Sequence, residues 1–311
     1  ILARQVEVIR GPSTLLYGAG TVGGLVNVTD QKIPTQMPAD GLEGTVGVRY
    51  NSGSDEKLAS AGVTAAIGDN FALRVEGSKR KANNYIAPDY WVEHHNDEAG
   101  HEDHNHGHDD AHEGDEKHET HFDKARRVDN TFAEGQTVNI GGSWIHERGF
   151  VGVSYSNRQD KYGLPGHSHE YHGCGPDHDN PNIIECPPHD DRGDDHAHHG
   201  GPWVDLESHR YDVRAELDQP FSGFDKLRAH ASYTDYEHDE LEESEVISNF
   251  KSKGYDARLE LVHKPVAGWE GVFGTQYSQQ KINLAGGAEE HDGHSHSGVL
   301  MADTKTEKYS L

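Results

Sequence analysis

The sequence lacks most features of a compact soluble protein. No run of uncharged apolar residues reaches the roughly 18 positions that a membrane-crossing helix needs, and hydrophobic residues make up only 32% of the 311 positions. Positive charge is also scarce, because 28 Lys and Arg stand against 54 Asp and Glu, a formal net charge of −26. We therefore expect no nucleic-acid partner, since a phosphate backbone binds a basic face.

Cysteine is almost absent, and neither end of the chain reads as a natural terminus. Cys174 and Cys186 lie in one stretch rich in Pro, Gly and His. We expect them to form a local disulfide in an oxidising compartment; two free thiols or soft metal ligands are the alternative. The chain starts at Ile1 without a signal peptide and stops at Leu311 in what reads as the start of another strand. We therefore expect a piece of a longer protein.

Much of the chain alternates between apolar and polar residues with a period of two. Between Tyr211 and Leu217, for example, the odd positions are apolar and the even positions are charged. Such runs predict about nine strands of roughly 8–14 residues, the length that a tilted strand needs to cross a bilayer. One apolar and one charged face fit a lipid-facing wall around a wet lumen.

The connections between these runs alternate in length. Short turns of a few residues alternate with long polar connections at 81–134, 160–205, 239–251 and 283–305. Outer-membrane barrels have short periplasmic turns and long extracellular loops. The pattern therefore predicts an all-β fold, a transmembrane antiparallel β-barrel; a soluble sandwich or propeller with polar insertions is the alternative.

The first forty residues differ from the rest. The run VEVIRGPSTLLYGAGTVGGLVNVTDQKIP, residues 6–34, closely resembles the end of the plug domain of TonB-dependent outer-membrane receptors. A phosphate loop is the poorer interpretation of its glycines, because no Gly-Lys-Ser/Thr ending or helix follows. The resemblance implies that residues 1–40 are the C-terminal part of a plug and 41–311 the first part of a barrel of about 22 strands. It also implies surrounding outer-membrane lipid and the TonB complex of the inner membrane as partner, bound through a segment absent from this chain.

Histidine is the most unusual feature of the composition. Twenty of the 25 histidines fall in three acid-rich segments, residues 94–121, 167–199 and 291–296. These segments hold too few apolar residues to build a core and should be solvated loops. The run from Tyr162 to Cys174, the cysteine pair and the 94–121 tract resemble loops of the zinc-uptake receptors of the same family.

The residue types in these loops suit metal binding. Imidazole and carboxylate groups together bind Zn²⁺, and also Cu²⁺ and Ni²⁺. Histidines two apart in an extended chain project to one side and can share an ion. We expect more ordered ligands in the 162–174 run, which has apolar and aromatic anchors, and dispersed ligands elsewhere; a hydrophilic loop with incidental histidine is the alternative. The ordered set is His167, His169, Glu170 and His172, and the dispersed set is His104, His106, His108, His112, His118, His121, His196, His198, His199, His294 and His296.

Strand parity sorts the five isolated histidines. His146, His209 and His263 share the parity of neighbouring apolar residues and should lie at the lipid-facing wall. His230 and His238 have the opposite parity and should face the lumen. For His230 we expect a hydrogen-bonded wall residue, and for His238 a place in the upper vestibule.

No catalytic arrangement is predicted, because no rigid element positions a nucleophile or a general base. The chain is therefore expected to be no enzyme but a TonB-dependent receptor that captures zinc at the cell surface and imports it into the periplasm. Acidic loops would concentrate the cation by electrostatic focusing. A haem or metal-chelate receptor, and a metal-binding surface adhesin that transports nothing, are the alternatives.

The cysteine pair yields the first testable prediction. A Cys174–Cys186 disulfide closes a short ring and should favour the ordered loop by about 3 kcal/mol on the chain-entropy model. Mass spectrometry of the native, unreduced protein after alkylation should find neither thiol modified. Two alkylated thiols would contradict the pairing.

Overall fold

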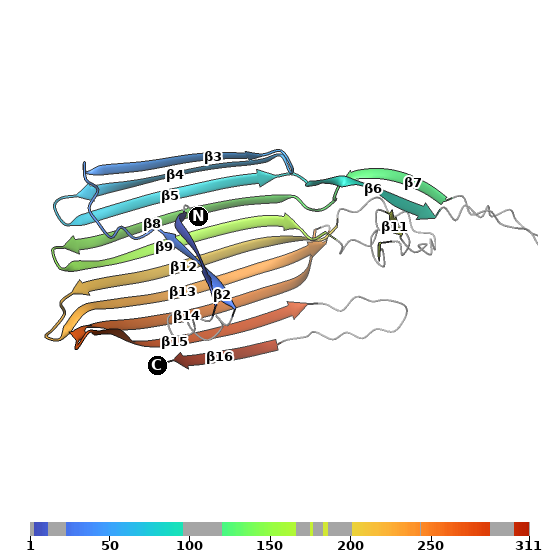
Figure 1. Ribbon diagram of the computed structural model, residues 1–311. Coiled ribbons are helices and arrows are strands. Elements are labelled where there is room, and N and C mark those ends of the chain that lie inside the picture. The colour runs from blue at the N-terminus through green and yellow to red at the C-terminus, as the bar shows by residue number, and fades with distance from the viewer. Residues whose placement is uncertain are drawn as a thin grey trace, which may run out of the picture.

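The computed structural model describes residues 3–11, 23–95, 120–165, 175–176, 183–185, 201–242, 244–286 and 302–310. Sixteen strands make up its regular structure (Figure 1). No helix within these ranges is long and apolar enough to cross a membrane.

Ten strands form one continuous antiparallel sheet. Their spatial order is β3–β4–β5–β8–β9–β12–β13–β14–β15–β16, so each strand lies beside the next sheet strand along the chain. The prediction of an all-β, antiparallel architecture with about nine strands is confirmed, and β16 brings the sheet to ten. The bounds are β3 (Leu42–Asn51), β4 (Glu56–Ile67), β5 (Phe71–Ala82), β8 (Ala133–His146), β9 (Gly149–Gly163), β12 (Trp203–Asp218), β13 (Phe224–Glu242), β14 (Glu245–Val266), β15 (Trp269–Gly286) and β16 (Ala302–Ser310).

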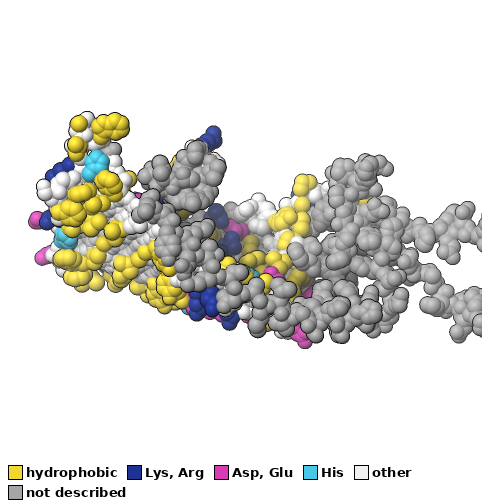
Figure 2. Space-filling model, turned by 90° about the horizontal axis from the view of Figure 1, so that it is seen from below, with side chains coloured by type: hydrophobic (Ala, Val, Ile, Leu, Met, Phe, Trp, Pro, Cys, Tyr) yellow, Lys and Arg dark blue, Asp and Glu magenta, His cyan; other side chains and the backbone are white. Residues whose placement is uncertain are grey.

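The two faces of the sheet have the reverse of the usual polarity. Val46 and Val48 are 85% and 83% exposed, whereas Arg74 and Glu76 are each only 3% exposed. Successive side chains of a strand point to opposite faces, so the alternation in the sequence separates an apolar outer face from a polar inner face. Figure 2 shows hydrophobic side chains in a band along the described part of the sheet. This arrangement fits a wall with lipid outside and water inside.

Short turns gather at one end of the sheet, the left in Figure 1, and the longer connections lie mostly at the other. In the turn from β14 to β15, Ala267 and Gly268 have φ values of 51° and 83°, the two positive values of a type I′ hairpin. In the turn from β8 to β9, a Cβ on Gly149 would lie 1.9 Å from the Glu216 carbonyl oxygen, so only glycine fits there.

Three of the predicted loops contain paired strands. The predicted loop 239–251 is instead the tip of the β13–β14 hairpin, where Asp239 pairs with Asn249. The acidic sequence does not predict this strand, because the groups that neutralise its carboxylates lie on the partner strand. Lys251 Nζ lies 2.7 Å from a Glu237 oxygen, and the Asn249 amide donates to the same carboxylate at 3.0 Å. Within 81–134, β6 (Ile86–His95) and β7 (Thr120–Arg127) form an antiparallel hairpin.

Short strands also occur between β9 and β12. β11 (Ile183–Glu185) pairs in parallel with β6 and in antiparallel orientation with β10 (Gly175–Pro176). The β6–β7 hairpin and these two strands form a separate four-stranded sheet. It extends beyond the end of the main sheet opposite the short turns (Figure 1).

The N-terminal part is a separate hairpin of β1 (Ala3–Arg10) and β2 (Gly24–Asp30). Their register pairs Val6 with Val28 and Ile9 with Leu25. Residues 31–41, called the connector below, lead from β2 into β3. The connector lies against the inner face of the main sheet, as the contacts of Lys32, Ile33 and Pro34 in the next section establish.

Candidate functional site

The connector is seated in a shallow depression made by small residues of β8 and β9. A Cβ on Gly141 would lie 2.0 Å from the Lys32 carbonyl oxygen, and one on Gly152 would lie 2.4 Å from Ile33 Cγ2. The Ser143 hydroxyl donates to the Pro34 carbonyl, and Ile33 is 3% exposed. Because any larger side chain at either glycine would displace the connector, these two positions determine how closely it approaches the wall.

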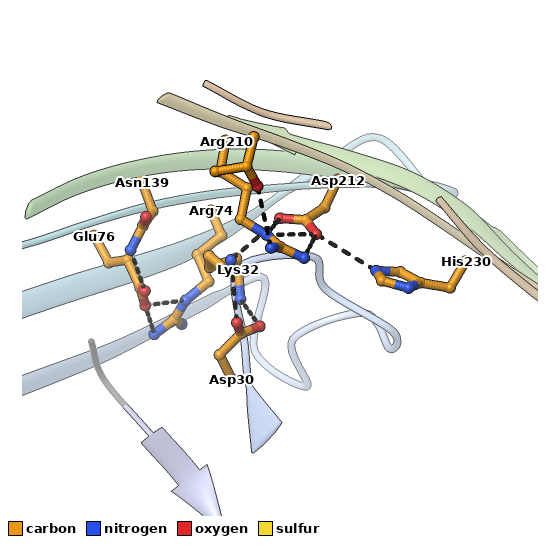
Figure 3. Close-up of polar contacts among 9 residues, drawn as sticks. Asp30, Lys32, Arg74, Glu76, Asn139, Arg210, Asp212 and His230 are labelled. Atoms are coloured by element: carbon orange, nitrogen blue, oxygen red, sulfur yellow. Dashed lines mark hydrogen bonds and ion pairs between the residues drawn. The ribbon is translucent and has the colours of Figure 1, made fainter. Parts of the chain in front are cut away.

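Lys32 joins the connector to the barrel wall electrostatically (Figure 3). Its ammonium nitrogen lies 3.2 Å from an Asp30 oxygen at the end of β2 and 3.3 Å from an Asp212 oxygen on β12. The Lys32 side chain is 14% exposed and that of Asp212 is 7% exposed. Charges this well shielded from water attract each other strongly, so loss of one partner leaves the other charge unfavourably buried.

Asp212 is also held by two groups of the wall itself. The Arg210 guanidinium donates to it, with Nη2 2.8 Å from Oδ1. His230 Nε2 lies 3.4 Å from the same oxygen. His230 thus lies on the inner face, opposite Arg214 and Arg258 in the register of the neighbouring strands. Its partner is a carboxylate already shared with two cations, which favours a structural role.

A second buried network lies on β4, β5 and β8. The Arg74 guanidinium donates to Glu76 at 3.0 Å and to the Thr64 hydroxyl at 2.8 Å. The Asn139 amide donates to the other Glu76 oxygen at 2.8 Å. The pair is thus satisfied within the wall (Figure 3), as a buried ion pair must be to avoid a large desolvation cost.

A cavity of about 980 Å³ lies between the connector and the inner face of the sheet. Its lining combines acidic Asp30, Glu216 and Glu260 with basic Arg214, Arg228 and Arg258. Several of these charges are paired across strands; for example, Arg228 Nε lies 3.3 Å from Glu216. The cavity therefore has mixed polarity, and a hydrated ion would meet both signs of charge in it.

His238 lies on the inner face near the long-loop end of β13. Its ring is stacked on Phe250 with 5.1 Å between the ring centroids, and its Nδ1 lies 3.0 Å from the Tyr236 hydroxyl. Its register partner Leu206 is 5% exposed. The surroundings of His238 are therefore aromatic and apolar, and one ring nitrogen is already used.

The three other isolated histidines lie with outer-face residues. His146 contacts Trp144 with 4.8 Å between ring centroids, and His263 contacts Phe273 at 5.9 Å. His209 Nδ1 lies 2.8 Å from the Tyr155 hydroxyl. The parity of the sequence thus sorts all five isolated histidines by face.

Most of the predicted metal ligands lie outside the described residues, as do Cys174 and Cys186. Of the set, only His121 has a described backbone position, in β7, where it is the register partner of His94. No group of three or more His, Cys, Asp or Glu side chains able to hold a metal ion occurs in the part of the chain that could be searched. The predicted ligands outside it are His104, His106, His108, His112, His118, His167, His169, Glu170, His172, His196, His198, His199, His294 and His296.

The networks around Lys32 and Glu76 were not predicted from the sequence. The alternation of the sequence predicts that Arg74, Glu76 and Asp212 lie on the inner face. Alternation predicts only the face to which a side chain points and does not predict its partner. Lys32 lies near the end of the plug-like run of residues 6–34, and nothing in that run indicates an ion-pair partner for it. Its link to Asp212 spans 180 residues, and only tertiary structure could reveal it.

Comparison with known proteins supports the fold and the location. No family profile matches the chain. The "Iron-regulated outer membrane virulence protein" of Vibrio cholerae serotype O1 is 34% identical over 73 residues, 24% of this chain and 11% of that protein. The "Ferrioxamine B receptor" of Salmonella typhimurium is 33% identical over 86 residues, 27% of this chain and 11% of that protein. The matched part is thus about a tenth of each relative.

Solved structures resemble nearly the whole chain. The "Copper transporter OprC" covers 92% of it with a TM-score of 0.58 and 12% identity, and the chain covers 34% of that protein. The siderophore receptor PiuA from Acinetobacter baumannii covers 99% with a TM-score of 0.55 and 15% identity, and the chain covers 42% of it. The predicted all-β fold, an antiparallel sheet like those of TonB-dependent receptor barrels, and the predicted outer-membrane location are confirmed. The similar proteins include receptors or transporters of metals and of metal chelates, and no single ligand is common to them.

The buried Lys32 link yields the second testable prediction. Lys32→Met should lower the free energy of unfolding by about 2 kcal/mol, because Asp30 loses its cation and Asp212 loses one of three partners. Lys251→Met is the matched control: its pair with Glu237 is about half exposed, and such pairs contribute about 1 kcal/mol or less. Guanidinium unfolding of both variants in detergent micelles measures the difference. Equal losses would show that the connector is not held by this ion pair.

Proposed function

We propose that the chain is part of a TonB-dependent outer-membrane receptor that captures zinc with histidine- and acid-rich loops and passes it towards the periplasm. The observation that carries the proposal is topological. The connections that contain the three histidine segments leave the main sheet after β5, β9 and β15, all at the end opposite the short turns. In outer-membrane barrels the short turns face the periplasm, so all three segments would start at the cell surface.

The hairpin β6–β7 supports a role for the first histidine segment. It extends beyond the main sheet (Figure 1) and joins the two ends of residues 96–119 to it. The register places His94 opposite His121 and Val92 opposite Asp123. The paired strands thus provide a fixed base for an otherwise polar segment.

Charge supports cation capture. The chain carries a formal charge of −26, and acids are interleaved with histidines in every one of the three segments. A negative surface raises the local concentration of a divalent cation and its rate of encounter. Neutral imidazoles would then hold the ion and exchange it. Energy for passage would come through the TonB complex, as in the receptors that this chain resembles.

The histidine-rich loops would have different roles in metal capture. His167, His169, Glu170 and His172, in the run anchored by apolar residues and the proposed disulfide, would act as the more ordered ligands because preorganised ligands lose less entropy on binding. The dispersed histidines, His104, His106 and His108 among them, would collect the ion. Cu²⁺ and Ni²⁺ suit the same donors.

A metal-chelate receptor is the second candidate function. It is favoured by the relatives, one of which is named a ferrioxamine B receptor, and by the arginines that line the inner cavity. A chelate receptor would bind the metal complex and show little affinity for the bare ion. The two functions therefore separate in a binding experiment with zinc chloride alone.

Zinc binding yields the third testable prediction. The full-length receptor in detergent should bind several Zn²⁺ ions at pH 7 and release them between roughly pH 7 and 5, since imidazole has an unperturbed pKa near 6.5 and its protonated form is no ligand. Isothermal calorimetry at the two pH values measures the change. Absence of binding at pH 7 would overturn the zinc proposal and favour the chelate receptor.

The different roles proposed for the loops yield the fourth testable prediction. Deleting residues 101–119 should slow radioactive zinc uptake by cells several-fold at low zinc and leave it nearly unchanged at high zinc, because a collecting loop matters only when the ion is scarce. The triple replacement His167→Ala, His169→Ala and His172→Ala should weaken capture more per histidine removed. A deletion that abolishes uptake at every concentration, beside a silent triple variant, would reverse the roles.

A further inference from the structure

The outer face has a sharp upper boundary, marked by tyrosines. Tyr155, Tyr211, Tyr233 and Tyr255 lie in register on β9, β12, β13 and β14. Successive ring centroids are 5.1, 6.2 and 4.6 Å apart. Rows of aromatic rings occur where the hydrocarbon of a bilayer meets its headgroups. The row therefore marks the level at which lipid phosphate groups contact this wall.

On β3, β4 and β5 the same boundary ends in lysines. The outward run on β4 ends at Ala59 and is followed towards the long-loop end by Lys57; Lys79 follows Gly77 in the same way on β5. Lys57 pairs in register with Lys81 on one side and with Tyr50 on the other. Lys57, Lys79 and Lys81, the lysine patch, are thus the first charged outward residues beyond the apolar band.

The charge of the lysine patch is poorly neutralised. Lys81 forms an ion pair with Glu134. In the part of the chain that the structure describes, neither Lys57 nor Lys79 forms an ion pair with a carboxylate, although Glu134 also attracts Lys79 at longer range, and both side chains are exposed. Like charges directly opposite each other in a sheet are destabilising. Glu134 is thus one carboxylate against three lysines, and the Lys57–Lys81 contact would be more favourable with a further anion, in a chain that is otherwise strongly acidic.

On the opposite flank of the sheet, outward lysines are paired with carboxylates. Lys251 and Lys253 also lie on the outer face beyond the tyrosine row, on β14. Lys251 Nζ is 2.7 Å from Glu237, and Lys253 Nζ is 2.9 Å from Asp235. Each of these lysines is thus neutralised by β13. The contrast shows that the missing counter-charge at the lysine patch is a local property and does not follow from outward lysines in general.

We propose that the lysine patch binds the phosphate groups of a phosphorylated lipid of the outer leaflet. Lysine is a point-charge donor suited to phosphate, and basic residues near a membrane surface are attracted to anionic headgroups. A lipid fits better than a free phosphate ion because the patch lies on the open outer face directly above the apolar band, where acyl chains and headgroup are contacted together. The bound lipid supplies the ion-pair partner that Lys57 and Lys79 lack. The site is independent of which metal the receptor carries.

The test uses the full-length receptor in neutral detergent, with diphosphorylated lipid A as probe and native mass spectrometry to count bound lipid. The triple variant Lys57→Gln, Lys79→Gln and Lys81→Gln should bind lipid A at least tenfold more weakly than the unmodified protein. The control Lys251→Gln and Lys253→Gln should bind it as the unmodified protein does. Dephosphorylated lipid A should bind all three proteins equally weakly, and excess inorganic phosphate should compete poorly.

A gain-of-binding variant makes the test independent of folding losses. Glu134→Gln removes the one acid paired within the patch and should strengthen lipid A binding about threefold. Heat-modifiable migration on gels checks that each variant is folded, and zinc binding should be unchanged in all of them. Equal binding of lipid A by the triple variant and the control, no gain in Glu134→Gln, or equal binding of the dephosphorylated lipid would overturn the proposal. Displacement by millimolar inorganic phosphate would overturn the lipid as the ligand.

Discussion

The register of the ten-stranded sheet is the constraint on which the rest of the structure depends. With a side-chain period of two, a slip of one residue between neighbouring strands would exchange the faces of a whole strand. The observed register instead places Asp212 diagonally opposite His230, whose Nε2 lies 3.4 Å from it, and Arg228 directly opposite Glu260. Many charges on the inner face are therefore paired across strands, and most of the apolar side chains of the strands lie outside. A wall with lipid on one side and water on the other needs both conditions at once.

The connector depends on the same register. Gly141 and Gly152 lie on adjacent strands, and together with Ser143 they leave room for Ile33 and Pro34 against the inner face. Lys32 then reaches Asp212, which Arg210 and His230 already orient. The plug-like hairpin is thus joined to the wall by backbone proximity and by one shared cation. Such a joint is specific in position and involves few groups.

The two ends of the sheet serve different chemistry. Tight turns such as Ala267-Gly268 close one end. The other end carries the acidic hairpin tip of β13–β14, the β6–β7 extension and the connections that hold most of the histidines. Metal capture and lipid contact would both take place in this half, the first on the loops and the second on the outer face below them. They draw on separate residues, since the lysine patch contains no metal ligand.

The sequence by itself determined the all-β class, the two faces and the end at which histidine accumulates, because alternation and loop length are local properties of the chain. It sorted His209 from His230 for the same reason. It missed the strand pairing around Asp239 and Asn249, since an acidic stretch shows no apolar period and its neutralising partners lie on the next strand. Only the tertiary structure decided that Lys32 meets Asp212, that Gly152 accommodates Ile33, and that Lys57 opposes Lys81. Each of these contacts joins residues of different strands or of the connector and the wall, and register between distant segments is set by the whole sheet, so no local pattern encodes it.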